Sequence, residues 1–178
     1  MNSNKHTSEP PQSLNDLITS LLEGEQAAYN QIIRSAIFSA NDFSAYASWS
    51  EACYTRNCIV HNEKFELILI CWCEGHQTPI HDHGGEECWV TVIDGALKET
   101  IYKQTEEGHL HPVRSFISKP NNVTYMKDFM GFHRLQNAAH KKSMSLHLYA
   151  KPIAHCRAFH EASKTFVKRE LEYDTSAE

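Results

Sequence analysis

The apolar residues near the start of the chain recur at helical spacing. Leucine and isoleucine side chains between residues 14 and 22 follow one another three or four positions apart, which predicts an amphipathic helix. Ser13, with Asp16 three residues later, resembles a capping box at the start of this helix, and Gly24 is a typical stop signal. The chain is therefore expected to begin its folded part with a helix.

A second stretch with the same periodicity follows. Residues 29–37 repeat the apolar spacing, so a second helix is predicted whose apolar face contacts the same core. A short third helix is expected over residues 43–49. Residues 1–12 are polar and contain two consecutive prolines, a composition typical of a frayed N-terminal tail. The helical part of the protein is thus expected over residues 13–49.

From residue 53 onward the periodicity changes to that of strands. Short segments rich in β-branched and aromatic residues alternate with turn signals. Candidate strands cover residues 53–61, 64–73, 87–94, 96–104, 131–137 and 143–149, with less regular ones at 113–117 and 123–126. Asp94-Gly95 predicts a tight hairpin between two of them, because a type I′ turn needs positive φ at both central positions. Residues 155–172 fit either a helix or a strand.

These elements predict a mainly β fold. Many short, evenly spaced strands after N-terminal helices indicate a small barrel or two-sheet jelly roll of antiparallel strands with an N-terminal helical cap. The 178 residues correspond to a single domain, expected over residues 13–172 with the barrel over 53–172, and residues 173–178 are expected to form a C-terminal tail. A chain of this length buries enough surface to fold without structural disulfides or metals.

Composition and charge exclude several function classes. The chain has 17 Lys and Arg against 22 Asp and Glu, a net charge of −5, and no basic run, so nucleic acid is not an expected partner. Its longest uncharged apolar stretch spans residues 67–73, far shorter than the roughly 20 residues of a membrane-spanning helix. The N-terminus has no apolar signal region, which predicts a cytoplasmic protein whose six cysteines are reduced.

Histidine is abundant, with 12 in the chain, and three histidines form a candidate metal site. His81 and His83 are two residues apart, so on a strand both would project from one face. Such a pair alone is equally typical of two surface histidines, but His133 adds a third imidazole in a later predicted strand. Three imidazoles suit divalent iron, zinc, copper or nickel, and the lack of an obligatory fourth ligand favours an open, reactive site.

The segments around these histidines resemble a known family. Gly75-x5-His81-x-His83-x4-Cys88-x6-Gly95 resembles the first cupin motif, except that Cys88 stands where a cupin usually has a metal-binding glutamate. Residues 131–137, which contain His133, resemble the second cupin motif. A cysteine at the glutamate position is similar to the cysteine dioxygenase family, and the segments at residues 54–57, 71–76, 95–100 and 145–149 resemble the same family in order and spacing.

The resemblance covers about residues 14–170, and it implies a reaction. It implies that His81, His83 and His133 bind Fe(II), and that the protein adds both atoms of O2 to the sulfur of L-cysteine to give cysteine sulfinic acid. The number of coordination positions agrees with this reaction, because three protein ligands on an octahedral ion leave three positions, for a thiolate, an amine and dioxygen.

Arg56 and Tyr54 lie two residues apart on a predicted strand, so they face the same way. From spacing alone, an arginine at the strand surface with its stem along apolar groups is the more common arrangement. The resemblance instead implies that Arg56 binds the carboxylate of the substrate, with assistance from Tyr54. A planar guanidinium is suited to this role because it pairs with a carboxylate through two hydrogen bonds.

Ser145, His147 and Tyr149 occupy alternate positions of one predicted strand, which places a hydroxyl, an imidazole and a phenol on one face. By spacing alone, this row is equally typical of a hydrogen-bonded polar face. The resemblance implies that the row orients the Tyr149 hydroxyl at the iron and the substrate, and that a thioether joins Cys88 to Tyr149. All four residues are therefore catalytic candidates.

Two other functions remain open at this point. One is a dioxygenase for another small thiol such as 3-mercaptopropionate. Arg56 is evidence against this alternative, because relatives that prefer this thiol typically carry glutamine at that position. The other is a non-catalytic cupin module that binds a metal and senses a small molecule. The partners expected of the enzyme are L-cysteine and O2, and the protein is expected to be a monomer.

Overall fold

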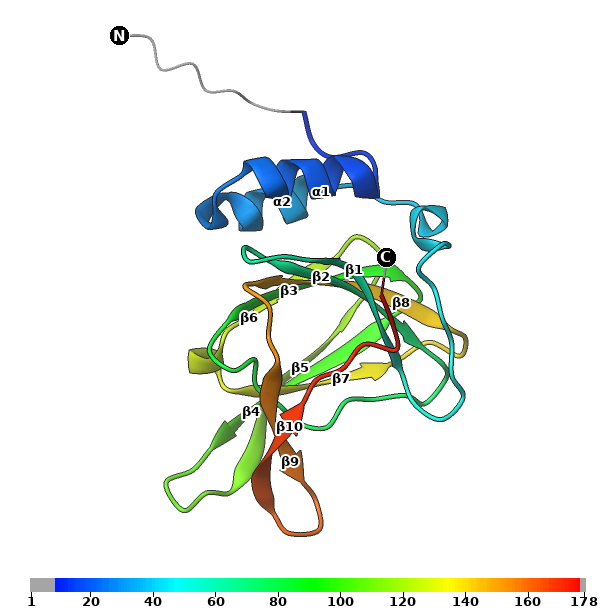
Figure 1. Ribbon diagram of the computed structural model, residues 1–178. Coiled ribbons are helices and arrows are strands. Elements are labelled where there is room, and N and C mark those ends of the chain that lie inside the picture. Colours follow the sequence, from blue (N-terminus) through cyan, green and yellow to red (C-terminus); the bar gives the residue numbers. More distant parts are fainter. Residues whose placement is uncertain (1–8, 177–178) are drawn as a thin grey trace, which may run out of the picture.

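The computed structural model describes residues 9–176, so residues 1–8 of the expected N-terminal tail lie outside the described part. Two helices, α1 (Leu14–Glu23) and α2 (Tyr29–Ser35), lie side by side on one face of the strands (Figure 1). As predicted, the Ser13 hydroxyl caps α1 by accepting a hydrogen bond from the backbone N–H of Asp16 at 3.2 Å. No helix of the described residues is long and apolar enough to cross a membrane.

The third predicted helix is displaced. Instead of a helix over residues 43–49, a short 3₁₀ turn, η2, covers Ala40–Phe43. Ser39 and Asp42 form a capping box at its start, and Phe43 is fully buried. This cap fixes the turn earlier in the chain than the apolar spacing suggests, because the local hydrogen bonds of Ser39 outweigh weak helical periodicity. Two other 3₁₀ turns, η1 (Gln26–Ala28) and η3 (Asp128–Met130), have three residues each.

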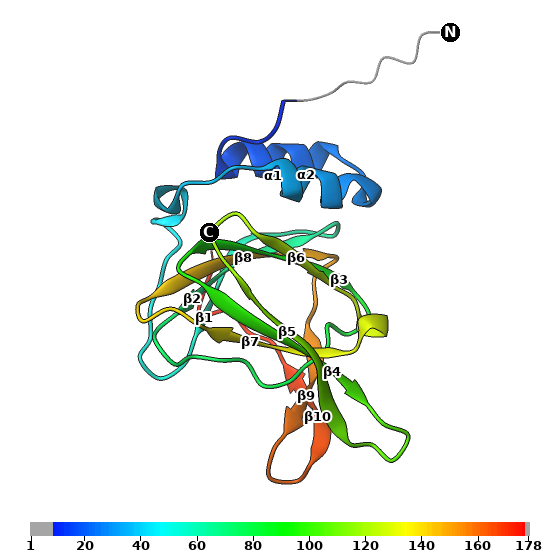
Figure 2. The same cartoon turned by 180° about the vertical axis from the view of Figure 1, so that it is seen from behind.

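The rest of the described chain forms two sheets and a hairpin, which confirms the predicted mainly β fold with N-terminal helices. The strands are β1 (Thr55–His61), β2 (Glu66–Trp72), β3 (Glu87–Asp94), β4 (Leu97–Gln104), β5 (Leu110–Ser118), β6 (Val123–Met126), β7 (Phe132–Asn137), β8 (Ser143–Ala150), β9 (His155–His160), β10 (Thr165–Glu170) and β11 (Thr175–Ser176). One sheet has the order β11-β1-β2-β8-β3-β6, and the other has the order β5-β4-β7. The β9–β10 hairpin extends away from the helices (Figures 1 and 2).

Strand β2 shows why the large sheet lies in the interior. All seven of its residues are buried, because alternate side chains contact different layers. Leu67, Leu69 and Cys71 belong to the core beneath the helices. Ile68 and Ile70 belong to a second core between the sheets. The candidate site opens from this second core.

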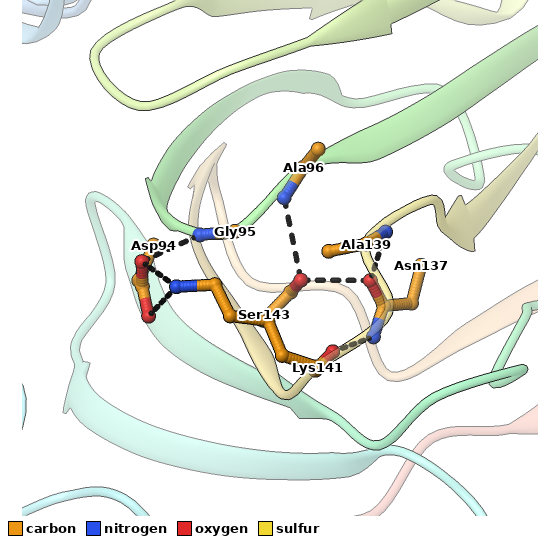
Figure 3. Close-up of polar contacts among 7 residues, drawn as sticks. All are labelled: Asp94, Gly95, Ala96, Asn137, Ala139, Lys141 and Ser143. Carbon is orange, nitrogen blue, oxygen red and sulfur yellow. Dashed lines mark hydrogen bonds and ion pairs between the residues drawn. The ribbon is translucent and has the colours of Figure 1, made fainter.

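The hairpin prediction at Asp94-Gly95 is wrong. Strand β3 pairs with β8 and β6, whereas β4 pairs with β5 and β7, so the turn carries the chain from one sheet to the other. Only Gly95 of the two has positive φ, at 77°. Figure 3 shows the contacts of this turn: Ser143 and Asn137 lie against it, and the Ser143 hydroxyl accepts a hydrogen bond from Ala96 N–H at 3.3 Å while it donates to Asn137 Oδ1 at 2.7 Å.

The C-terminal segment is more ordered than expected. Residues 155–170, which fitted helix or strand, form the β9–β10 hairpin. Residues 173–176, expected as part of a tail, lie along β1, where β11 pairs in parallel with Asn57 and Cys58. Asp174 accepts a hydrogen bond from the Arg56 N–H through Oδ2 at 2.8 Å, and its own N–H donates to the Arg56 carbonyl at 2.8 Å. Backbone pairing of this kind has no sequence signature in so short a strand.

Candidate metal centre and substrate pocket

The structure brings the three predicted histidines together. The ligand nitrogens of His81, His83 and His133 all lie within 4.8 Å of one another, and Nε2 of His83 is 3.0 Å from Nε2 of His133. His133 is on β7, but His81 and His83 lie in the irregular connection between β2 and β3 rather than on the expected strand. His81 makes only isolated bridges, which include paired backbone hydrogen bonds of 2.9 Å with His133.

Second partners fix the orientation of two of the rings. The fully buried His133 ring places Nδ1 2.7 Å from Oε1 of Glu99, which is itself buried on β4. His81 Nδ1 lies 3.1 Å from the Pro79 carbonyl oxygen. These contacts leave Nε2 of each ring free to face the centre of the cluster. An imidazole held through its other nitrogen by a carboxylate or carbonyl is the usual arrangement of a metal-binding histidine.

Burial keeps the imidazoles of His81 and His83 neutral. Loss of solvent, together with the neighbouring His133, lowers the pKa of His81 to about 3. The same causes, in the same order, hold the pKa of His83 well below its usual range. A neutral imidazole offers a nitrogen lone pair at neutral pH without first losing a proton, so the cluster is ready to bind a cation.

The donor set fits a divalent metal ion. Two nitrogens that each lie about 2.1 Å from one ion can be at most about 4.2 Å apart. The 3.0 Å between Nε2 of His83 and Nε2 of His133 satisfies this limit, and the ligand nitrogen of His81 lies within 4.8 Å of both. Cys88, which replaces the cupin glutamate, is not among the clustered ligands. Three neutral nitrogens leave the full charge of the ion uncompensated, which favours an anionic ligand at the remaining positions.

A pocket opens beside the cluster and contains most of the remaining predicted residues. Its wall includes Tyr54, Arg56, His81, His147, Tyr149 and Cys156. Arg169, near the end of β10, and Leu171, just after this strand, complete one side of the pocket. One predicted metal ligand, His81, both predicted carboxylate-binding residues and two catalytic candidates, His147 and Tyr149, therefore border one pocket.

Arg56 lies in this pocket with unused hydrogen-bond donors. Its side chain is 11% exposed, and its buried Nε and Nη2 atoms have no hydrogen-bond partner among residues 9–176. A buried cation with free donors is costly unless an anion meets it. Arg56 is therefore a buried arginine and not a surface one, and the Glu66 carboxylate lies 3.9 Å from its Nη2. Its role in binding the substrate carboxylate stays a prediction.

Tyr54 lies directly before β1 and stacks on a buried indole. Its ring centroid is 5.0 Å from that of Trp72, with 33° between the planes. Burial raises the pKa of the Tyr54 hydroxyl, although Arg169 and Arg56 oppose the shift. The hydroxyl is therefore a neutral donor at physiological pH, in the same pocket wall as Arg56.

The polar row on β8 is hydrogen-bonded internally. Ser145 Oγ lies 2.9 Å from His147 Nε2 and accepts a hydrogen bond from Trp72 Nε1 at 3.0 Å. The rings of His147 and Tyr149 are stacked at 6.3 Å. Burial, reinforced by His133, keeps the pKa of His147 well below its usual range. The row is thus a neutral, ordered chain that ends at Tyr149.

Cys88 and Tyr149 face each other across two strands. They are direct partners in the antiparallel β3–β8 register, and both side chains are buried. Burial raises the pKa of both groups above their usual ranges. The Tyr149 ring also lies next to one candidate metal ligand, with its centroid 5.6 Å from that of the His83 ring.

Sequence reasoning missed two buried carboxylates. Glu99 is 2% exposed and Glu66 is fully buried. Strand alternation could have revealed Glu99, because it lies two residues after the inward-facing Leu97 on β4. Glu66 is the single charged residue of an otherwise apolar strand, β2, which was an available but unused signal.

Comparison with known proteins agrees with the geometry. A family model described as cysteine dioxygenase type I matches residues 3–162. Cysteine dioxygenase type 1 of Danio rerio is 32% identical over 160 residues, which are 84% of this chain and 80% of that protein. The human protein of the same name is 33% identical over 161 residues, with the same two shares.

Among solved structures, a RmlC-like cupin protein from Desulfovibrio desulfuricans superimposes with a TM-score of 0.46 and 16% identity, over 60% of this chain and 91% of that one. The family model covers almost the whole chain, and the relatives exceed 30% identity over most of it. This chain belongs to the cysteine dioxygenase type I family.

Proposed function

We propose that L-cysteine is the thiol on which this dioxygenase acts, and that the product is cysteine sulfinic acid. The balanced reaction is RSH + O2 → RSO2H, in which sulfur loses four electrons and dioxygen accepts them. The observation that carries the proposal is that Arg56, whose Nε and Nη2 donors have no hydrogen-bond partner among the described residues, lines one pocket together with His81 of the histidine cluster. That combination suits a small molecule with a thiol at one end and a carboxylate at the other.

The proposed cofactor is Fe(II), held by His81, His83 and His133. When bound, the ion supplies Lewis acidity that favours the thiolate and a centre at which dioxygen is activated. Glu99 orients the His133 ring through Nδ1, and the Pro79 carbonyl orients the His81 ring in the same way. Three neutral ligands are expected to favour an anionic thiolate more than a ligand set with a carboxylate would.

Arg56 and Tyr54 are proposed to bind the substrate carboxylate. The free Nε and Nη2 donors of Arg56 offer the parallel pair that a carboxylate accepts. The Tyr54 hydroxyl stays protonated because burial raises its pKa, so it is available as a further donor. Binding would satisfy buried donors that are otherwise unpaired, which gives the carboxylate its selectivity.

Ser145, His147 and Tyr149 are proposed to hold a proton donor beside the reacting sulfur. Burial raises the pKa of Tyr149 well above its usual range, so its hydroxyl remains protonated. The contacts from Trp72 through Ser145 to His147 fix the imidazole next to the Tyr149 ring. The row thereby limits the rotation of the phenol and aims its hydroxyl into the pocket.

We also propose a thioether between Cys88 and Tyr149. The bond would form between Sγ and a ring carbon, with loss of the thiol proton and of one ring hydrogen. The two electrons released would pass to dioxygen, the oxidant of the main reaction. The direct pairing of the two residues across β3 and β8 and the burial of both side chains support this proposal.

Two further expectations concern the location and the assembly of the protein. All six cysteines are free thiols, which agrees with a reducing cytoplasmic location. A monomer stays a prediction that size-exclusion chromatography with light scattering would test.

The function is tested by anaerobic loading with Fe(II), followed by oxygen-electrode and product measurements. L-cysteine should consume one O2 per sulfinic acid formed, and His81→Ala should purify nearly free of iron and inactive, because loss of even an orienting partner can cost about 10- to 100-fold in metal affinity. No oxygen uptake by fully loaded protein would refute the enzyme and favour a sensor. Full iron and activity in His81→Ala would refute the ligand set.

A further inference from the structure

His83 differs from the other two candidate ligands in how its ring is held. The Nδ1 atom of His133 faces Glu99, and that of His81 faces the Pro79 carbonyl. The Nδ1 atom of His83 is buried and has no hydrogen-bond partner among the described residues. Its Nε2 atom lies 3.0 Å from Nε2 of His133. The direction of this ring therefore depends on packing and on the position of its backbone.

The backbone that carries His83 is not part of a strand. It lies in the connection between β2 and β3 and is followed by Gly84 and Gly85, whose φ angles are 63° and 100°. Two consecutive glycines leave a chain a wide choice of conformations. The bridge between His81 and His133 holds the residue two positions earlier. His83 itself therefore depends on other contacts for its position.

Asp128 supplies these contacts. Its Oδ1 accepts a hydrogen bond from the His83 N–H at 2.9 Å, and its Oδ2 accepts one from the Gly85 N–H at 2.7 Å. Distances of this size are typical of the strong hydrogen bonds that carboxylates accept. One side chain thus holds both the candidate ligand residue and the glycine turn that follows it.

Asp82, which lies between the two histidines of the segment, is directed elsewhere. Its oxygens accept hydrogen bonds from the backbone N–H and from Nε of Arg157 on β9, at 2.8 Å and 2.6 Å. Its hydrogen bond within the segment is the longer one from the Gly84 N–H, at 3.3 Å. Asp82 therefore joins the segment to β9, whereas Asp128 contacts the backbone of His83 directly.

Asp128 is itself anchored next to the other half of the histidine cluster. It begins η3, and Lys103 of β4 donates a hydrogen bond to the Phe129 carbonyl of this turn at 3.0 Å. The turn ends at Gly131, immediately before β7, which carries His133. Asp128 therefore connects two segments whose candidate ligands are 50 residues apart in the chain.

We propose that Asp128 is a positioning residue of the metal centre, which holds the backbone of His83 so that its imidazole faces the ion shared with His81 and His133. The inference rests on the proposed function, because it takes these three histidines as the ligands. Its consequence is that loss of Asp128 weakens metal binding although all three ligands remain in the chain, since a displaced imidazole must be reoriented before it can bind.

The test is equilibrium binding of Co(II) to the metal-free protein, measured by competition with a chelator and by the visible spectrum of the bound ion. Asp128→Ala should bind Co(II) about 10- to 100-fold more weakly than the parent, as is usual when a partner that orients a metal ligand is lost. At saturating Co(II) its spectrum should also differ from that of the parent, because the spectrum reports the coordination geometry.

Asp128→Asn separates the effect of position from that of charge. It removes the same negative charge as Asp128→Ala, but its amide oxygen can still accept the His83 N–H, whereas its NH2 group cannot accept the Gly85 N–H. Its affinity should therefore be intermediate, roughly 3- to 10-fold weaker than that of the parent. Equal losses in the two variants would assign the effect to charge and overturn the positioning role.

Asp42→Ala is the matched control. Asp42 is half-buried, as is Asp128, and its Oδ2 accepts a hydrogen bond from the Ser39 N–H at 2.9 Å in η2, outside the histidine cluster and the pocket wall. Both alanine variants should lower the free energy of unfolding of the metal-free protein in urea, because each loses hydrogen bonds to the backbone. The Co(II) affinity of Asp42→Ala should stay within about 2-fold of the parent.

The outcomes separate this inference from the proposed function. A Co(II) affinity like that of the parent in folded Asp128→Ala overturns the role of Asp128, and so does an equal loss in Asp42→Ala, which would reflect general destabilisation. Co(II) and Fe(II) binding by a parent that consumes no oxygen with L-cysteine refutes the proposed reaction and leaves the Co(II) comparison as the test of Asp128. A parent protein that binds no Co(II) refutes the ligand set and this inference with it.

Discussion

Burial fixes the state of single side chains in and beside the pocket. It lowers the pKa of His81, His83 and His147, so these imidazoles stay neutral, and it raises the pKa of Tyr149, so its hydroxyl stays protonated. Arg56 retains unpaired donors, which have a cost that a bound carboxylate would recover. Substitutions at this scale should therefore affect function more than folding.

Arg56→Ala should lose on the order of 30- to 4,000-fold in kcat/KM for L-cysteine, because truncating one partner of a buried charge pair costs about 2 to 5 kcal/mol. Arg56→Lys should recover only part of this loss, since an ammonium keeps the charge but not the two parallel hydrogen bonds. Steady-state oxygen uptake measures both variants.

Two controls accompany this prediction. Iron content should stay normal in both variants, because Arg56 is not among the clustered ligands. Cysteamine, which lacks the carboxylate, should be a poor substrate of the parent protein. Efficient oxidation of L-cysteine by Arg56→Ala, or a preference for cysteamine, would contradict the assignment of Arg56.

Cys88→Ser should abolish formation of the thioether. Incubation of the parent protein with iron, O2 and L-cysteine should lower its intact mass by two hydrogens, because one Sγ–C bond replaces an S–H and a ring C–H. Mass spectrometry of intact protein and of tryptic peptides measures this loss. An unchanged mass after many turnovers would refute the cross-link and leave the dioxygenase proposal standing, since neither the iron site nor Arg56 depends on it.

At the scale of elements, the site depends on how the two sheets are joined. The candidate ligand His133 comes from the small sheet, whereas Tyr149 and Arg56 come from the large one. The turn at Gly95 connects the sheets, and Ser143 and Asn137 brace it (Figure 3). At the edge of the large sheet, β11 and Asp174 bind the backbone of β1, which carries Arg56. These connections set the distance between metal and carboxylate sites.

Gly95→Ala should destabilise the protein by about 2 to 4 kcal/mol, in the range of strained or overpacked sites. A Cβ there would lie 2.0 Å from Ser143 Oγ and 2.7 Å from its Cβ, at a φ of +77°. Urea denaturation measures the free energy of unfolding.

Gly85→Ala is the matched control for this prediction. Gly85 has a φ of +100°, but beyond its own chain neighbours no described atom lies within 4 Å of the point that an alanine Cβ would occupy. Only backbone strain of about 1 kcal/mol is therefore expected. Equal destabilisation by the two substitutions would show that close packing against Ser143 is not what the turn requires.

At the scale of the whole molecule, the buried histidines couple folding to pH. Burial lowers the pKa of His81 to about 3 and holds those of His83 and His147 well below the usual range. The unfolded chain binds protons at these histidines below about pH 6.5, whereas the folded chain does not. Stability is therefore complete above about pH 6.5 and falls as the pH drops toward the folded pKa values.

The metal-free protein should accordingly lose roughly 3 kcal/mol or more between about pH 6.5 and 5, because each such histidine contributes up to about 1.4 kcal/mol per pH unit. Urea denaturation in the presence of a chelator measures this slope. His147→Asn should reduce the slope by about one histidine's share, whereas substitution of the exposed His111 should not. A slope unchanged by His147→Asn would show that its imidazole does not stay neutral in the folded state.

The sequence by itself determined the fold class and the identity of the candidate residues, because strand and helix periodicities and motif spacings are local properties of the chain. Ser13 at its helix start and the change of pattern near residue 53 needed no tertiary information. The histidines of the candidate site were equally visible, since residue type and spacing carry their chemistry.

Only the tertiary structure decided which partners these residues contact. Asp94-Gly95 has the local chemistry of a hairpin, yet its two strands belong to different sheets, because the long-range pairing of β3 with β8 and of β4 with β7 outweighs turn preference. The carboxylates of Glu99 and Glu66 find their partners 34 and 107 residues away in the chain, at His133 and Tyr173. Contacts at such separations depend on how the sheets and the C-terminal segment pack, and no local pattern encodes that.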